Sequence, residues 1–170
     1  MSRTLKLTPT DSVTIRRSTP ELLEVEAVYG HKGNPPPKHL HPSQDEHFEV
    51  MSGTLRARIA GEERTLERGA TLDVPRGTVH QMWNAGDEPA RVIWQTRPAG
   101  RTEQWFASVD ALHREGHVGR DGTPGPLAFG PLLSEYRDVF RLAAGPAPLM
   151  KAATSALGAA GRARGYRPPA

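Results

Sequence analysis

Residues 39–53 read HLHPSQDEHFEVMSG, and this stretch decides the fold. His39 and His41 are two positions apart, so on a β-strand both side chains point to the same face. After the turn residues PSQD, Glu46 has the same parity as Phe48 and Val50, two apolar residues that we expect to face inward. The stretch therefore predicts a chelating histidine pair and a carboxylate inside a β-structure.

Two further polar residues of the stretch, His47 and Glu49, have the opposite parity. They are expected on the outer face of the strand. A β-bulge would shift the register and let either of them compete with Glu46 for the interior. The sequence leaves that alternative open.

A histidine outside the stretch strengthens the interpretation as a metal site. The segment GATLDVPRGTVHQMWN, residues 69–84, places His80 on a strand after a Pro-Arg-Gly turn. Three imidazoles and one carboxylate can then converge, whereas His39 and His41 alone would be an ambiguous histidine cluster.

Short alternating runs dominate residues 12–96 and predict an antiparallel sandwich or barrel. In TLRARIA, residues 54–60, Leu55, Ala57 and Ile59 alternate with Arg56 and Arg58. One face of the sheet should therefore contact water. Breaks at Gly-, Pro-, Asn- and Asp-rich positions supply the turns between strands.

After Pro98 the pattern changes to a period of about 3.6 residues, which predicts helices. The first should span residues 102–116, with Thr102 as N-cap and Gly116 as the stop. A second is expected from Pro131 through Leu142, and a third from about residue 148 to 160. We therefore divide the chain into a β-barrel at residues 1–100 and a C-terminal helical extension at residues 101–170, packed on the barrel or on a partner subunit.

Composition excludes several classes of function. The chain has 170 residues and no cysteine, so thiolate metal sites, disulfides and a cysteine nucleophile are excluded. No apolar run approaches the length of a membrane span or a signal peptide, and we expect a cytoplasmic protein without a membrane partner. The net charge of +3 gathers in the Gly/Ala/Pro-rich tail without interleaved aromatic residues, so no nucleic-acid partner is predicted.

Two spaced motifs make a family resemblance specific. The first motif consists of Gly33, five residues, His39, one residue, His41, four residues, Glu46, six residues and Gly53. The second consists of Gly69, five residues, Pro75-Arg76-Gly77, two residues, His80, three residues and Asn84.

Together the motifs resemble the two motifs of the cupin superfamily, in particular small single-domain bacterial cupins. The resemblance covers residues 12–96, and the tail after Arg101 is similar to helical extensions of some small bacterial cupins. It implies a mainly β fold, the double-stranded β-helix or jelly-roll barrel. It also implies one divalent metal ion per chain, held by His39, His41, Glu46 and His80.

The implied ligand set suits Fe, Mn, Ni, Co, Cu or Zn, and affinity alone does not choose among them. Such a set leaves positions on the ion for a small molecule, so the sequence favours an enzyme of dioxygenase, isomerase or lyase type. The alternative is a non-catalytic module that binds or senses a small molecule. The two differ in whether a further titratable group faces the site, and the nearest ones in the sequence are Tyr29 and His31.

Other expectations concern the pocket and the assembly. Three residues are candidates for lining the pocket. Phe48 has the same strand parity as Glu46, Met82 has the same parity as His80, and Trp94 lies on another expected strand of the barrel. Exposed strand edges are usually covered or paired. We therefore expect a homodimer.

Overall fold

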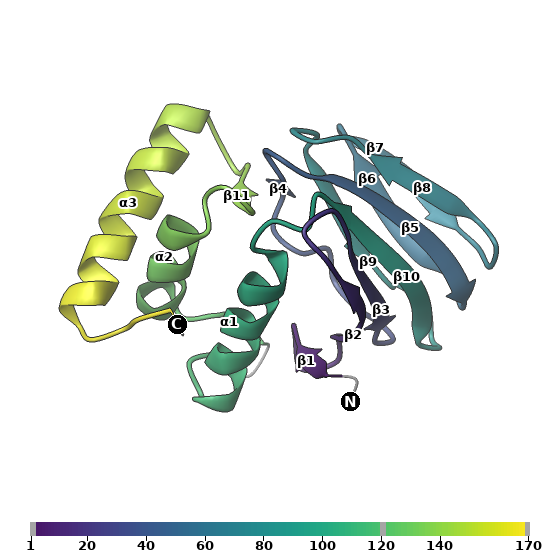
Figure 1. The fold of residues 1–170 in the computed structure, drawn as a ribbon, viewed down its shortest axis with the longest axis horizontal. Coiled ribbons are helices and arrows are strands. Elements are labelled where there is room, and N and C mark those ends of the chain that lie inside the picture. The colour runs from purple at the N-terminus through teal and green to yellow at the C-terminus, as the bar shows by residue number, and fades with distance from the viewer. Residues whose placement is uncertain (1–2, 120–121, 169–170) are drawn as a thin grey trace.

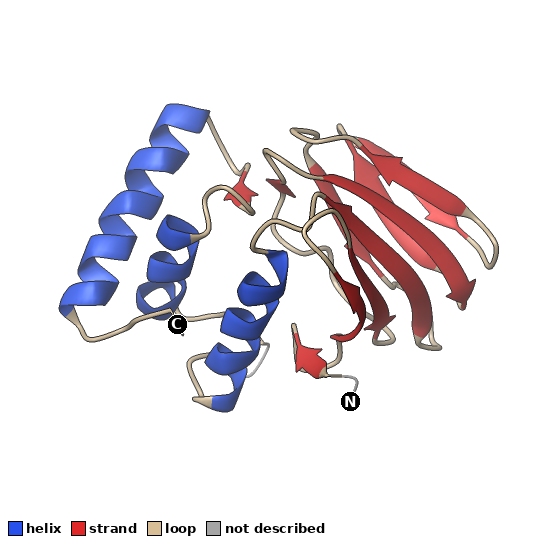
Figure 2. Cartoon of the chain, viewed as in Figure 1, coloured by secondary structure: helices blue, strands red, loops and turns tan. Residues whose placement is uncertain are grey.

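Two antiparallel sheets lie face to face and form the barrel, and helices lie at one end of it (Figures 1 and 2). The computed structural model describes residues 3–119 and 122–168. One sheet has six strands in the order β1 (Thr4–Lys6), β2 (Ser12–Ser18), β3 (Leu23–Tyr29), β10 (Ala90–Arg97), β5 (Asp45–Ser52) and β8 (Thr71–Val74). The other has five, in the order β11 (Arg141–Leu142), β4 (His39–Leu40), β9 (His80–Trp83), β6 (Leu55–Ile59) and β7 (Glu62–Leu66).

The period-two pattern separates core from surface as predicted. Along β5, Glu46, Phe48 and Val50 are buried, whereas Glu49 is exposed and His47 is half-buried. The strand therefore keeps its parity through the expected metal-binding segment, and no bulge in β5 brings His47 or Glu49 inward. Apolar side chains from both sheets meet between them and form the core.

The turn between β5 and β6 requires glycine. Gly53 has a φ of +75°, and a Cβ atom there would lie 2.8 Å from the Cα of Ala90. A side chain is therefore excluded both by the backbone conformation and by the neighbouring strand.

The first helix, α1, spans Thr102–Arg114, and it buries Trp105, Val109 and Leu112, whose spacing of three to four residues puts them on one face. The prediction of Thr102 as N-cap is wrong, because Arg101 occupies that position. Thr102 is instead buried in the first turn, where its hydroxyl accepts a hydrogen bond of 2.6 Å from Gln44.

The second helix, α2, spans Pro126–Glu135, so the prediction of a helix from Pro131 to Leu142 is wrong. Pro126 takes the first turn, where its missing N–H is not needed, and Pro131 lies inside the helix. The chain leaves the helix after Glu135, and residues 141–142 form β11, which pairs with β4 of the same chain.

The third helix, α3, spans Ala147–Ala163 and packs along α2. A Cβ on Gly161 would lie 2.1 Å from the carbonyl oxygen of Leu127, so glycine allows the two helices to approach closely. No helix of residues 3–119 and 122–168 is long and apolar enough to cross a membrane.

Candidate metal centre

The three predicted histidines come together at the end of the barrel that faces the helices. His39 on β4 pairs directly with His80, the first residue of β9, and His41 lies just beyond β4. The ring centroids of His39 and His80 are 4.4 Å apart, and His41 lies 5.4 Å from each. One ring nitrogen of each residue lies within 4.8 Å of the others, a spacing suited to a shared metal ion.

Backbone carbonyls fix the orientation of all three rings. The Nδ1 atom of His39 lies 2.8 Å from the oxygen of Pro37, that of His41 2.6 Å from Val139, and that of His80 3.0 Å from Thr78. A carbonyl oxygen can only accept, so each Nδ1 carries the proton and each Nε2 has a free lone pair. This is the tautomer that a metal-binding histidine needs.

Glu46 lies beside two of these lone pairs. Its carboxylate is buried, with Oε1 3.3 Å from Nε2 of His41 and Oε2 3.1 Å from Nε2 of His80. Trp94 donates its indole N–H to Oε1 at 3.0 Å. In the described structure, neither Nε2 of His41 nor Oε2 of Glu46 has a hydrogen-bond partner.

These contacts place electron-rich atoms against one another in a buried space, which is costly unless a cation or proton lies between them. A divalent metal ion would satisfy both unpartnered atoms at once. The donor set of imidazole nitrogens and one carboxylate therefore fits such an ion chemically.

Burial and the mutual contacts of these side chains also shift the pKa values of His39, His41 and Glu46. Burial, reinforced by repulsion from His80 and His41, lowers the pKa of His39 to about 3. Burial also lowers the pKa of His41. For Glu46, burial alone would raise the pKa, but the neighbouring histidines outweigh it and hold the pKa below its usual value. His39 is thus neutral and Glu46 charged near neutral pH, the protonation states that a metal ion requires.

His80 differs from the other two histidines. Burial opposes its charged form, but the carboxylate of Glu46, with Oε2 3.1 Å from Nε2 of His80, attracts that charged form strongly enough to outweigh burial and raise the pKa of His80. Without a metal ion, His80 is therefore the residue that accepts a proton toward Glu46.

An aromatic side chain from the C-terminal extension covers the histidines. Phe140 stacks on His39, with centroids 4.7 Å apart and an interplanar angle of 20°, and meets His41 edge-on at 6.0 Å. Trp105 of α1 stacks on Phe140 at 4.7 Å. The helix expected from Pro131 through Leu142 included Phe140 and Val139 but gave neither residue a place at the site, since no local pattern in the sequence indicates their contacts with His39 and His41.

The residues predicted to line the pocket are buried or half-buried near the site. Phe48 stacks on Trp94 at 5.3 Å, which places Trp94 between Phe48 and the carboxylate of Glu46. Met82 is buried on β9, with the same parity as His80.

Tyr29 and His31, the two candidates for proton transfer, differ in their exposure to solvent. Tyr29 ends β3 with the inward parity of Val25 and Ala27 and packs against the core. Burial raises its pKa, and the charges of Asp11 and Glu46 raise it further. His31 lies in a turn and is exposed, so it is not part of the interior.

Comparison with known families agrees with this geometry. Residues 26–96 match the family model described as "Cupin domain", and the match runs from the middle of β3 to the next-to-last residue of β10. This part of the barrel is similar to a cupin domain. The prediction of the cupin superfamily from the two motifs is thereby confirmed for this region.

Curated relatives cover part of the chain. The tetracenomycin polyketide synthase protein TcmJ of Streptomyces glaucescens is 38% identical over 95 residues, which is 55% of this chain and 56% of TcmJ. Quercetin 2,3-dioxygenase of Bacillus subtilis is 36% identical over 64 residues, 38% of this chain and 19% of that enzyme. The chain thus matches about half of TcmJ and a smaller part of the dioxygenase.

Solved structures share the fold. KdgF from Halomonas sp. superposes with a TM-score of 0.52 at 20% identity, covering 59% of this chain and 90% of KdgF. An RmlC-like cupin from Shewanella frigidimarina gives 0.53 at 18% identity, covering 60% and 88%. The predicted fold class, a cupin barrel followed by helices, is confirmed.

Proposed function

We propose that the protein is a metal-dependent enzyme of oxygenase, isomerase or lyase type that acts on a small polar or aromatic molecule. The observation that carries the proposal is the set of three histidines whose Nδ1 atoms are fixed by carbonyls and which each bring one ring nitrogen within 4.8 Å of the others. The names of two relatives, a polyketide synthase protein and a dioxygenase, support a substrate with aromatic or enolic groups.

His39, His41, His80 and Glu46 would hold one divalent ion, which we leave open among Fe, Mn, Ni, Co, Cu and Zn. When bound, such an ion supplies Lewis-acid polarisation of an oxygen atom and a template for the substrate. The chain's own residues orient the ligands through the carbonyls of Pro37, Thr78 and Val139.

Tyr29 favours an enzyme over a binding module. It is the predicted proton-transfer residue that faces the interior, and its raised pKa keeps the hydroxyl protonated. A phenol in this state can donate a hydrogen bond to a bound oxygen atom.

Elemental analysis of the purified protein tests the metal site. We expect about one divalent ion per chain, and loss of stoichiometric metal in His80→Ala. His31→Ala, which changes an exposed histidine, is the matched control and should retain the ion. Stoichiometric metal in His80→Ala would contradict the proposed ligand set.

Turnover is tested separately, with the metal-loaded protein and a panel of flavonols, naphthols and enolic ketones. Oxygen uptake would identify oxygenase activity, and NMR of the panel would identify isomerisation or bond cleavage. If several panel members bind but none is converted, the protein is the binding module instead.

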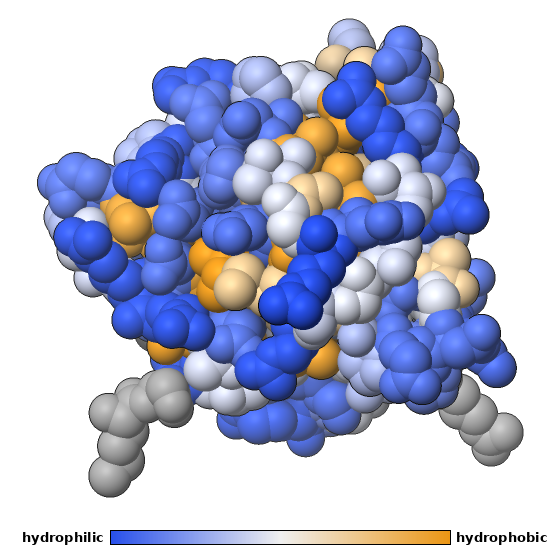
Figure 3. Space-filling view, turned by 90° about the vertical axis from the view of Figure 1, so that its right-hand side faces the viewer, coloured by the Kyte–Doolittle hydropathy of each residue, from blue (hydrophilic) through white to orange (hydrophobic). Residues whose placement is uncertain are grey.

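We also propose a homodimer. The outer strands of both sheets have an unpaired edge in the described structure, and Met51 on β5 is 47% exposed. The face opposite the helices is mainly hydrophilic but is interrupted by apolar side chains (Figure 3). Light scattering at several concentrations should give twice the chain mass, and a monomer throughout would contradict the dimer.

A further inference from the structure

Residues 136–140, the segment between α2 and β11, carry none of the proposed ligands but contact two of them. The carbonyl of Val139 fixes Nδ1 of His41, and the ring of Phe140 lies on His39. The geometry of the metal centre therefore depends on where this segment is held.

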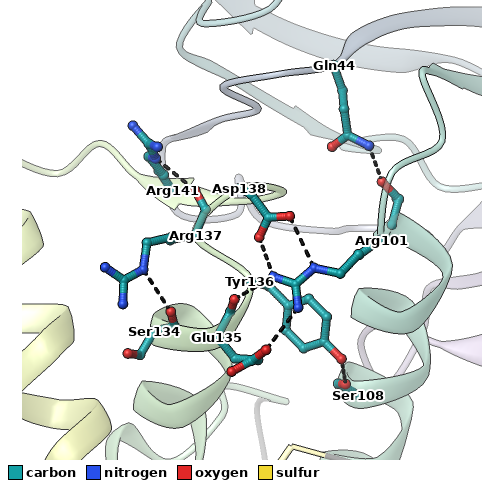
Figure 4. Close-up of polar contacts among 10 residues, drawn as sticks. Gln44, Arg101, Ser108, Ser134, Glu135, Tyr136, Arg137, Asp138 and Arg141 are labelled. Atoms are coloured by element: carbon teal, nitrogen blue, oxygen red, sulfur yellow. Dashed lines mark hydrogen bonds and ion pairs between the residues drawn. The ribbon is translucent and has the colours of Figure 1, made fainter. Parts of the chain in front are cut away.

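Arg101, at the start of α1, holds the segment with four hydrogen bonds (Figure 4). Its Nε and Nη2 donate to the two carboxylate oxygens of Asp138 at 3.1 and 2.5 Å. Its Nη1 donates to the carboxylate of Glu135 at 2.9 Å, and Nη2 also reaches the carbonyl oxygen of Glu135 at 2.7 Å. One planar guanidinium thus fixes both the end of α2 and the residue just before Val139.

The same guanidinium lies over the ring of Tyr136, 4.9 Å from its centroid. Tyr136 meets Trp105 edge-on at 5.8 Å, and Trp105 stacks on Phe140. Arg101 therefore connects to His41 through the backbone at Asp138 and Val139, and to His39 through a row of aromatic rings.

Arg101 is itself positioned by the loop that follows the first two proposed ligands. Gln44, three residues after His41, is buried and donates to the carbonyl oxygens of Pro98 and Ala99 and to the hydroxyl of Thr102. These bonds fix the turn that presents Arg101 to the segment.

We propose that Arg101 is a positioning residue of the metal centre, which holds residues 136–140 so that Val139 fixes the tautomer of His41 and Phe140 supports His39. The inference rests on the proposed metal site. Because the side chains of Arg101, Glu135 and Asp138 are 41%, 51% and 50% exposed, their ion pairs add little to global stability. The effect of removing Arg101 should therefore appear at the metal centre.

The test uses the full chain in two states. In the metal-free protein, the ring N–H of His41 is buried and bonded to Val139 at 2.6 Å, so it should give a slowly exchanging proton NMR signal. The ring N–H of His80, bonded to Thr78 outside the segment, is the internal reference. In the second state, Co²⁺ is titrated and its visible absorption gives both affinity and geometry.

In Arg101→Met we expect the His41 signal to exchange faster while the His80 signal persists, and Co²⁺ affinity to fall about tenfold, as for other partners that orient metal ligands. Asp138→Asn, which keeps the shape of the side chain, should show the same changes and decides the matter if Arg101→Met does not fold. Because both substitutions remove the same interaction, the double variant should bind Co²⁺ no more weakly than the single variant with the larger loss of affinity.

Arg114→Met is the matched control, because Arg114 ends α1 and, among the described residues, its ion pair is with Asp110 of the same helix. It should bind Co²⁺ like the wild type. Wild-type Co²⁺ affinity and spectrum in both Arg101→Met and Asp138→Asn would overturn the proposal, whatever happens to the His41 signal. Absence of Co²⁺ binding by the wild type would instead refute the proposed metal site itself.

Discussion

The indole N–H of Trp94 donates to Oε1 of Glu46 at 3.0 Å, across the pairing of β10 with β5. The same ring stacks on Phe48 and meets Phe106 edge-on. One aromatic side chain thus joins the apolar core to the carboxylate proposed to bind the metal.

Trp94→Phe should keep most of the packing but remove the one hydrogen bond that Oε1 of Glu46 accepts from a side chain within the described structure. Partners of this kind change metal affinity by about 10- to 100-fold, so we expect weaker Co²⁺ binding within that range. Trp83→Phe is the control, since Trp83 is also buried but its ring lies against Arg58 in the other sheet. Equal Co²⁺ affinities in the two variants would show that the bond to Trp94 does not orient Glu46.

Phe140→Ala should affect both stability and the metal site. Phe140 is half-buried, so we expect the free energy of unfolding to fall by about 1–3 kcal/mol, less than for a fully buried phenylalanine. Loss of its stack on His39 should also weaken Co²⁺ binding, by about tenfold.

Phe129→Ala separates these two effects. Phe129 is also half-buried in the extension, with its ring centroid 5.9 Å from that of Trp105, and within residues 3–119 and 122–168 it has no ring contact with a histidine. Chemical unfolding and Co²⁺ titration of both variants are the measurements. A similar loss of affinity in Phe129→Ala would mean that Phe140 acts only through stability.

The contribution of the extension could not have been predicted from the sequence. Strand parity is a local property, so alternation alone placed Glu46 inward and His47 outward. Pairing of β11 with β4 joins Leu142 to His39 across more than a hundred positions, and nothing local in the sequence encodes it. The helical periodicity that seemed to continue through Phe140 was overridden by this long-range pairing.

Gly53→Ala should destabilise the barrel more than Gly69→Ala. Both glycines have positive φ, +75° and +84°, so alanine at either costs about 1–2 kcal/mol for the backbone conformation alone. Only at Gly53 does the added Cβ also meet a neighbouring strand, at 2.8 Å from Ala90, whereas nothing lies within 4 Å at Gly69. Urea unfolding of the two variants should differ clearly, and equal losses would show that the β5–β6 turn relaxes away from Ala90.

Stability of the metal-free protein should fall as the pH is lowered from about 6.5. The unfolded chain protonates His39 near its ordinary pKa of about 6.5, whereas the folded chain does so near 3. Between these values the unfolded state binds more protons, so the free energy of unfolding decreases by up to about 1.4 kcal/mol per pH unit from this residue.

The pKa shifts of His41, Glu46 and His80 define the pH range in which the effect of His39 can be measured. The lowered pKa of His41 acts in the same direction, and that of Glu46 adds a further loss once the pH falls below its ordinary value of 4.5. The raised pKa of His80 acts oppositely, because the stability it contributes is lost as the pH rises through its folded value. Urea unfolding between pH 4.5 and 6.5 therefore isolates the two histidines with lowered pKa. His39→Asn should have a shallower slope than wild type and His31→Asn the wild-type slope, while parallel curves for all three would exclude a buried neutral His39.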